Sequence, residues 1–173
     1  PDKRDNKIYK INEKAKKEQM NKNKFLVTGG AGFIGSHIVE ALLKKGYFVR
    51  VLDNFSTGKR ENLSFANEYP SSTLEIIEGD IRSYNIVRRS LEDIDIILHQ
   101  AALPSVPRSI KDPITTNEVN VCGTLNILKA AVDAGVKRVV YASSSSVYGD
   151  NPTLPKHEDM PPNPSMGLPA GRM

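Results

Sequence analysis

The chain of 173 residues has no tryptophan, one cysteine and no long hydrophobic run. A single cysteine cannot form an internal disulfide, which is typical of a reducing compartment, so we expect a cytoplasmic protein. No stretch reaches the ~18 apolar residues that cross a bilayer, so we expect no membrane-spanning helix, and no signal-peptide pattern precedes the first predicted strand. Cys122 falls inside a helical pattern, where we expect a small buried side chain.

Excess charge is confined to one end of the chain. Residues 1–22 carry eight Lys/Arg and four Asp/Glu, a net +4 that equals the net charge of the whole chain. Residues 23–173 are therefore neutral overall, whereas a nucleic-acid-binding domain is basic on its folded part. We expect no nucleic-acid partner and no metal, and we interpret residues 1–22 as a basic N-terminal extension.

Apolar runs and helical patterns alternate after residue 23. Short runs rich in branched residues predict strands at 24–28, 48–53, 74–78, 94–99 and 138–143, and helices are predicted at 33–45, 83–91 and about 113–134. Asp112 and Pro113 have the form of an N-cap followed by proline at the first helical position. Val121, Leu125, Leu128 and Val132 recur at helical spacing, so we expect them to face the sheet. The alternation predicts an α/β fold, a Rossmann-like doubly wound parallel sheet with its ligand at the C-terminal ends of the strands.

The most specific local motif follows the first predicted strand. Residues 28–35 read TGGAGFIG and stand between a strand and a helix, as a dinucleotide-phosphate turn requires. Gly29 allows the tight turn, Gly32 allows the backbone to approach a pyrophosphate, and Gly35 allows the helix to pack closely on the strand. The helix N-terminus then offers N–H groups to the phosphates. The alternative is a tight turn in an ordinary βα unit.

Asp53 ends the second predicted strand, 18 residues after Gly35. An acidic side chain near this position binds the adenosine ribose hydroxyls in dinucleotide-binding units. Its charge would repel a 2′-phosphate, so we expect NAD rather than NADP as the cofactor. We therefore assign an NAD-binding Rossmann domain to residues 23–150, and we expect residues 151–173, with six prolines, to form an irregular tail.

Six segments together resemble the extended short-chain dehydrogenases/reductases of the NAD-dependent epimerase/dehydratase family. They read TGGAGFIG at 28–35, LDNFSTGKRENL at 52–63, EGDIR at 78–82, HQAALPSVPRSIKDP at 99–113, TTNEVNVCGTLNIL at 115–128 and SSSSVYGD at 143–150. LDNFSTG and HQAALPSVPRSI are most similar to bacterial UDP-N-acetylglucosamine (UDP-glucose) 4-epimerases of surface-polysaccharide synthesis. The resemblance covers about residues 20–164 and implies an isomerase that uses NAD to act on a UDP-sugar.

The resemblance also implies cofactor contacts at matching positions. They are Gly29, Gly32, Phe33, Ile34 and Gly35 in the phosphate turn; Asp53, Asn54, Ser56, Thr57, Gly58, Asp80 and Ile81 around adenosine; and Ala101, Ala102 and Asn120 toward the pyrophosphate and nicotinamide. Two of them have a simpler alternative. Asp80 is also typical of a turn after a strand, and Asn120 is also explained as a helix side chain bonded to a neighbouring loop.

Ser144 matches the family's catalytic serine, whose hydroxyl would hydrogen-bond the reacting sugar oxygen. Ser145 and Ser146 are alternates within the same serine run. Ser105, Val106 and Arg108 resemble the segment that lies beside the sugar. Without the family, both stretches would be interpreted as loops.

The family's general base, a tyrosine four residues before a lysine, has no counterpart in the sequence. The family spacing would place this pair at Leu168 and Arg172, and no Tyr-x3-Lys occurs anywhere in the chain. Leucine cannot exchange a proton, and arginine stays protonated. We therefore expect the N-terminal portion of such an epimerase, without its C-terminal substrate lobe, and little activity of these 173 residues alone.

Two other functions stay open. One is a non-catalytic dinucleotide-binding module. The other is a nucleotide-sugar dehydratase or decarboxylase, although dehydratases commonly carry Thr-Asp-Glu where this chain has Ser145-Ser146-Val147. Helix pairs of this fold often build dimers, so a homodimer is a further expectation.

Overall fold

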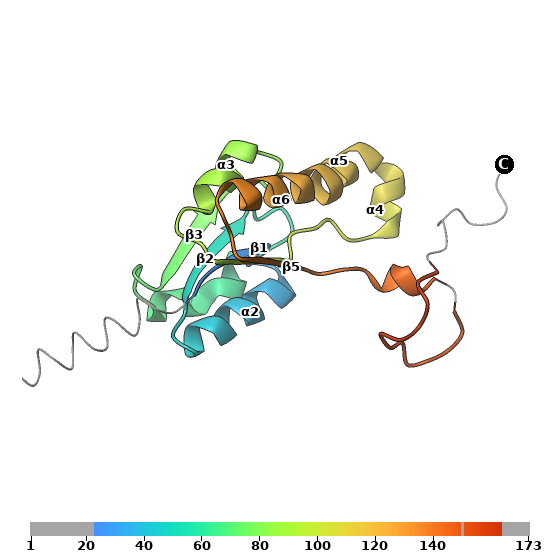
Figure 1. Ribbon diagram of the computed structural model, residues 1–173, viewed down its shortest axis with the longest axis horizontal. Helices are drawn as coiled ribbons and strands as arrows, with labels where there is room; N and C mark the ends of the chain where they lie inside the picture. The colour runs from blue at the N-terminus through green and yellow to red at the C-terminus, as the bar shows by residue number, and fades with distance from the viewer. Residues whose placement is uncertain (1–22, 150, 164–173) are drawn as a thin grey trace, which may run out of the picture. The chain divides into compact units, whose positions relative to one another are not determined.

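Figure 1 shows the computed structural model, which describes residues 23–149 and 151–163. The chain divides into two compact units, Pro1–Tyr141 and Ala142–Met173, and each is described by itself. The expected division into an extension, an NAD-binding domain at 23–150 and a tail stays a prediction, and residues 1–22 lie outside the described part.

The first unit is built on five parallel strands in the order β3-β2-β1-β4-β5. They are β1 (Lys24–Thr28), β2 (Phe48–Asp53), β3 (Leu74–Glu78), β4 (Ile96–His99) and β5 (Arg138–Tyr141). The chain runs from β1 outward to β3 and then returns to β4 on the other side of β1. This reversal confirms the doubly wound α/β fold, and it places the expected ligand crevice at the C-terminal ends of β1 and β4.

Helices cover both faces of this sheet (Figure 1). On one face lie α2 (Phe33–Lys44) and the 3-10 segment η1 (Arg60–Glu68); on the other lie α3 (Tyr84–Ser90), the π-helical η2 (Glu118–Gly123) and α6 (Thr124–Asp133). Two further helices, α4 (Val106–Lys111) and α5 (Pro113–Asn117), lead from β4 into η2. The side chain of Asp112 accepts the Thr115 N–H at 3.1 Å, which confirms the predicted N-cap.

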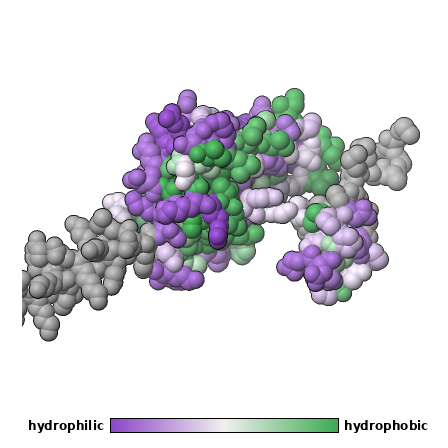
Figure 2. Space-filling model, in the orientation of Figure 1, coloured by the Kyte–Doolittle hydropathy of each residue, from purple (hydrophilic) through white to green (hydrophobic). Residues whose placement is uncertain are grey.

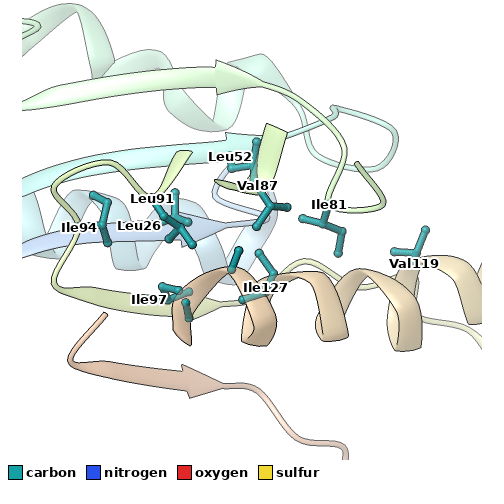
Figure 3. Close-up of a cluster of buried hydrophobic side chains, with 11 residues drawn as sticks. Leu26, Leu52, Ile81, Val87, Leu91, Ile94, Ile97, Val119 and Ile127 are labelled. Carbon is teal, nitrogen blue, oxygen red and sulfur yellow. The ribbon is translucent and has the colours of Figure 1, made fainter. Parts of the chain in front are cut away.

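Successive strand residues supply two separate hydrophobic cores, because side chains alternate between the faces of a sheet. Val27 and Val51 pack against α2 and η1, whereas Leu26 and Leu52 pack toward α3 and α6. Figure 3 shows the second of these clusters, in which Ile127 of α6 lies beside Ile97 of β4. Every one of these strand side chains is fully buried, so the strand ends are held on a rigid platform.

Two predicted strands are shorter in the structure. The run predicted at 94–99 forms β4 only from Ile96, because Ile94 joins the core from a turn in which Asp93 has a φ of 58°. The run predicted at 138–143 ends at Tyr141, the last residue of the first unit.

The predicted facing of the long helix is wrong. Val121, Leu125, Leu128 and Val132 are 58%, 63%, 43% and 78% exposed, and we call them the outer α6 stripe. The buried side of η2 and α6 is instead formed by Val119, Gly123, Ile127, Ala130 and Ala131. A Cβ on Gly123 would lie 2.6 Å from Cδ1 of Ile81, a core residue in the turn after β3, so the helix comes too close at this point for a larger side chain.

Because this face of η2 and α6 is the buried one, Cys122 is exposed, which corrects the expectation that it is buried. Figure 2 shows hydrophobic side chains on the face of the molecule that carries α6 and β5. On β5, Val140 and Tyr141 are also exposed.

Candidate dinucleotide site

A cavity of about 990 Å³ lies at the C-terminal ends of the strands in the first unit. Its walls are formed by the turn after β1, the loops after β2, β3 and β4, and parts of α4, α5 and η2. The predicted cofactor residues that line it are Gly29, Gly32, Phe33, Ile34, Gly35, Asp53, Asn54, Ser56, Thr57, Gly58, Asp80, Ile81, Ala101 and Ala102. The fold therefore brings together residues from four separate sequence segments.

The turn after β1 forms the floor of the cavity, and two of its glycines cannot be replaced without displacing backbone. Gly29 has a φ of 66°, and a Cβ there would lie 2.7 Å from the Ala101 nitrogen. A Cβ on Gly35 would lie 2.1 Å from the Gly29 carbonyl oxygen. Residues 32–35, at the start of α2, line the cavity, and the positive end of the helix is open there because no side chain caps it and its first turn holds no acidic residue. This cradle fits a pyrophosphate.

Asp53 is oriented by the backbone on both sides of its carboxylate. Its Oδ2 accepts the Ala31 N–H at 2.9 Å, and its Oδ1 accepts the Phe55 N–H at 2.8 Å. The side chain is buried but lines the cavity. Each carboxylate oxygen keeps a further lone pair, so the pair can accept two vicinal hydroxyls, as a ribose presents them.

Asp80, after β3, is the centre of a charged network at the rim. Both of its oxygens accept bonds from the Arg82 guanidinium, and Asn54 donates to Oδ2 at 3.0 Å. These bonds, led by the one from Arg82, lower the pKa of Asp80 to about 2. Arg82 also reaches Glu118 of η2 at 3.2 Å, so it links two walls of the cavity. Sequence reasoning did not select Arg82, although it ends the EGDIR segment.

Asn120 is not one of the described residues that line the cavity. Its amide nitrogen donates to the Leu103 carbonyl oxygen at 3.0 Å, and its oxygen accepts the Leu103 N–H at 2.8 Å. In this structure Asn120 therefore holds the loop after β4, which is the simpler of the two expected roles. Ala101 and Ala102, on the same loop, do lie at the cavity.

Of the predicted substrate-side residues, Arg108 lines the cavity, whereas Ser105 and Val106 do not. Ser105 is the N-cap of α4 with a φ of 107°, a strained value for a residue with a side chain. Further lining residues, which the sequence analysis did not select, lie on the loop after β4 and on α4, α5 and η2. They include Gln100, Leu103, Pro104, Lys111, Thr115, Thr116 and Val119.

The serine run lies in the second unit. Ser144 precedes the 3-10 segment η3 (Ser145–Tyr148), and its carbonyl oxygen accepts the Val147 N–H at 3.1 Å. Leu168 and Arg172 lie outside the described residues. The catalytic assignment of Ser144, with Ser145 and Ser146 as alternates, stays a prediction.

Residues 23–149 and 151–163 contain no helix long and apolar enough to span a bilayer. The same residues contain no group of three or more His, Cys, Asp or Glu side chains placed to hold a metal ion.

A doubly wound parallel sheet with a glycine turn, an open helix N-terminus and a carboxylate at the next strand end defines a dinucleotide-binding protein of the Rossmann class. Residues 25–167 match the NAD dependent epimerase/dehydratase family. The chain belongs to this family, as its motifs indicate.

Named relatives agree with this assignment. The UDP-glucose 4-epimerase of Mycolicibacterium smegmatis is 44% identical over 150 residues, which are 86% of this chain and 47% of the relative. The structure of a UDP-N-acetylglucosamine 4-epimerase from Methanobrevibacter ruminantium with UDP-N-acetylmuramic acid is 40% identical, with a TM-score of 0.73 over 83% of this chain and 45% of that one. DesIV, a dTDP-glucose 4,6-dehydratase from Streptomyces venezuelae solved with NAD, is 42% identical, with a TM-score of 0.74 over 82% and 45%. The chain thus spans less than half the length of these relatives.

Proposed function

We propose that this chain is the NAD-binding part of a nucleotide-sugar 4-epimerase that interconverts UDP-GlcNAc and UDP-GalNAc, or UDP-Glc and UDP-Gal. The observation that carries the proposal is the cavity at the C-terminal ends of the strands, in which the glycine turn and the oriented Asp53 carboxylate lie together. The two epimerase relatives above support the substrate class.

The residues that line the cavity fit successive parts of NAD. The turn at Gly29–Gly35 would hold the pyrophosphate, Asp53 the adenosine ribose, and the Asp80 carboxylate the adenine side. When bound, NAD supplies a reversible hydride acceptor for C4 of the sugar. Ser144 would hydrogen-bond the oxygen at that carbon, and Arg108 would lie beside the sugar nucleotide.

We further propose that these 173 residues do not epimerise UDP-sugars by themselves. The sequence contains no Tyr-x3-Lys, and a positioned general base is worth ~10²–10⁴-fold in rate. A longer chain carrying that pair and the substrate lobe would restore turnover. The biological setting that we propose is surface-polysaccharide synthesis in the cytoplasm.

A dehydratase is the second candidate, because DesIV is as similar to this chain as the epimerases are. The segment Ser145-Ser146-Val147 favours the epimerase, since dehydratases commonly carry Thr-Asp-Glu there. The third candidate is a dinucleotide-binding module that catalyses no reaction. Assaying the chain completed with a Tyr-x3-Lys and a second lobe separates them: sugar interconversion, water elimination or NAD binding alone.

The cofactor assignment is tested by titrating the chain with NAD and with NADP in a calorimeter. We expect NAD to bind more tightly, and the Asp53→Ala variant to lose this preference because nothing then repels the 2′-phosphate. Glu92→Ala, an exposed carboxylate outside the cavity lining, is the matched control and should keep the preference. Equal affinity of the unaltered chain for both dinucleotides would contradict the role of Asp53.

We also propose a homodimer, formed through the outer α6 stripe. Its four members follow one another at intervals of four, three and four residues, the spacing of a helix–helix seam. An antiparallel pair of such helices would set Leu125 against Leu128 of the second copy, and Val121 against Val132. The surface is therefore self-complementary, as a two-fold interface requires.

A further inference from the structure

His99 is a buried polar side chain that no role in the site yet explains. It ends β4, it is 6% exposed, and its two ring nitrogens contact hydroxyls on two different elements. Nδ1 lies 2.6 Å from Oγ1 of Thr28 at the end of β1, and Nε2 lies 3.0 Å from Oγ1 of Thr124 at the start of α6. The ring therefore joins the strand before the glycine turn to the helix across the sheet.

The neighbouring bonds determine which ring nitrogen carries the proton. The Thr124 hydroxyl donates its only proton to the Asn120 carbonyl oxygen at 2.7 Å, so it must accept from Nε2–H of His99. Nδ1 of a neutral ring is then an acceptor, and Thr28 donates to it. The Thr28 oxygen accepts the Ala101 N–H at 3.3 Å. All the donors and acceptors in this series of hydrogen bonds are satisfied only when the His99 ring is neutral.

Burial favours that neutral form. Desolvation lowers the pKa of the His99 imidazole below its ordinary value of 6.5, and no charged side chain contributes to the shift. The ring is thus held as a neutral donor–acceptor pair near neutral pH.

Both backbone walls that would contact the cofactor are tied to this chain of bonds. The glycine turn starts directly after Thr28, and it touches the loop after β4 so closely that a Cβ on Gly29 would meet Gln100 and Ala101. The same loop is fastened at Leu103 by Asn120, one turn before Thr124. Asn120 lies in the π-helical η2, and such segments often occur at functional sites.

We propose that His99 is a positioning residue for the dinucleotide, which as the Nε2–H tautomer sets the spacing between the glycine turn and the loop at Gln100–Leu103. The proposal rests on the proposed function for the identity of the ligand. His99 is not among the residues that line the cavity, so it acts on the two walls through Thr28 and through Thr124 and the Asn120–Leu103 pair.

The tautomer is tested on the unaltered chain, without cofactor, by ¹⁵N NMR of labelled histidine. The chain has three histidines, so the ring signals can be assigned by replacing His37 and His157 in turn. We expect a lone-pair nitrogen at Nδ1 and an N–H at Nε2. A proton on Nδ1 at neutral pH, in either the other tautomer or the imidazolium, would overturn the proposal.

The positioning role is tested by comparing NAD affinity with thermal stability in three variants. His99→Phe replaces the imidazole by an aromatic ring without nitrogens and leaves Thr28 without its acceptor, so we expect NAD affinity to fall by about tenfold or more. His99→Asn keeps one donor and one acceptor and should recover part of that loss. Ser90→Ala removes a fully buried hydroxyl that donates to the Ile86 carbonyl oxygen and is not part of the cavity lining, so it should lower the melting temperature without changing NAD affinity.

The outcomes separate the two hypotheses. If the unaltered chain binds NAD and folded His99→Phe binds it equally well, the positioning role is overturned and the proposed function stands. If the unaltered chain does not bind NAD, the proposed function fails, and the ¹⁵N shifts still decide the arrangement of His99. Should His99→Phe not fold, the comparison of His99→Asn with Ser90→Ala at matched melting temperature decides.

Discussion

Asp80 shows how a single side chain couples the candidate site to stability. Its carboxylate is paired with Arg82 and Asn54, so the pKa is lowered from 3.8 to about 2 in the folded chain. Because protonation costs more in the folded state than in the unfolded state, the stabilisation is complete above the unfolded pKa. It is lost as the pH falls through the folded pKa. The pair is partly exposed, so its contribution is screened to about 1 kcal/mol.

We therefore expect Asp80→Asn to lower the free energy of unfolding by about 1 kcal/mol at neutral pH. The difference from the unaltered chain should begin to shrink as the pH falls below 3.8 and should disappear below about 2, where both proteins carry a neutral side chain at position 80. Urea unfolding across this range measures the difference. A gap that stays constant with pH would show that the lost bonds, rather than the charge, account for the effect.

At the scale of elements, the continuous helix formed by α5, η2 and α6 carries two hydrophobic stripes, and only one of them packs against the core. The outer α6 stripe and the buried stripe have the same helical period, and the outer one holds the larger side chains. The buried stripe faces the core because Gly123 allows a close approach to Ile81 and Ala130 and Ala131 are small, and Ile127 joins the core cluster to which Ile97 also belongs. Size alone does not identify the packed face of a helix.

Alanine substitutions on the two stripes should therefore differ sharply. Ile127→Ala removes a fully buried side chain and should cost about 2–4 kcal/mol of unfolding free energy. Leu125→Ala, on the outer stripe, should change it by less than about 0.5 kcal/mol. Both are measured by urea unfolding at a concentration that keeps the chain monomeric. Equal losses would mean that the outer stripe is also packed.

For the whole molecule, the main consequence of this arrangement is exposed apolar surface. The outer α6 stripe adds to exposed Val140 and Tyr141 on β5, and surfaces of this kind promote association. Hydrophobic surface on a parallel sheet is normally covered on both sides. The chain spans under half the length of the three relatives named above.

Light scattering tests the proposed self-association. We expect a mass above the 19.1 kDa of one chain, and a mass nearer to it after Leu125→Lys and Leu128→Lys are combined, because two charges would be buried in the seam. Leu154→Lys is the matched control, since Leu154 is 79% exposed and lies in the second unit. An unchanged mass in the double variant would assign the association to another surface, and a monomeric unaltered chain would contradict it.

Local patterns in the sequence were sufficient to predict the alternation of strands and helices and the position of the glycine turn. The runs at 24–28, 48–53 and 74–78 form strands with those bounds, because continuous apolar runs between turns are a local signature of buried parallel strands. The glycine turn and Asp53 lie in one βαβ unit, so spacing along the chain was enough to place them in a common site. The family resemblance added Asp80, Ala101 and Ala102, which now line the same cavity.

Tertiary structure alone decided the relations between segments distant in sequence. Thr28 and His99 are 71 residues apart, and Arg82 and Glu118 are 36 apart, so no local pattern indicates that they bond. The facing of α6 depended on how near the helix could come to Ile81, and the role of Asn120 depended on the path of the loop at Leu103. Periodicity specifies which residues share a face; only the packed neighbours determine which face is buried, because burial is a property of the space between elements and not of one element.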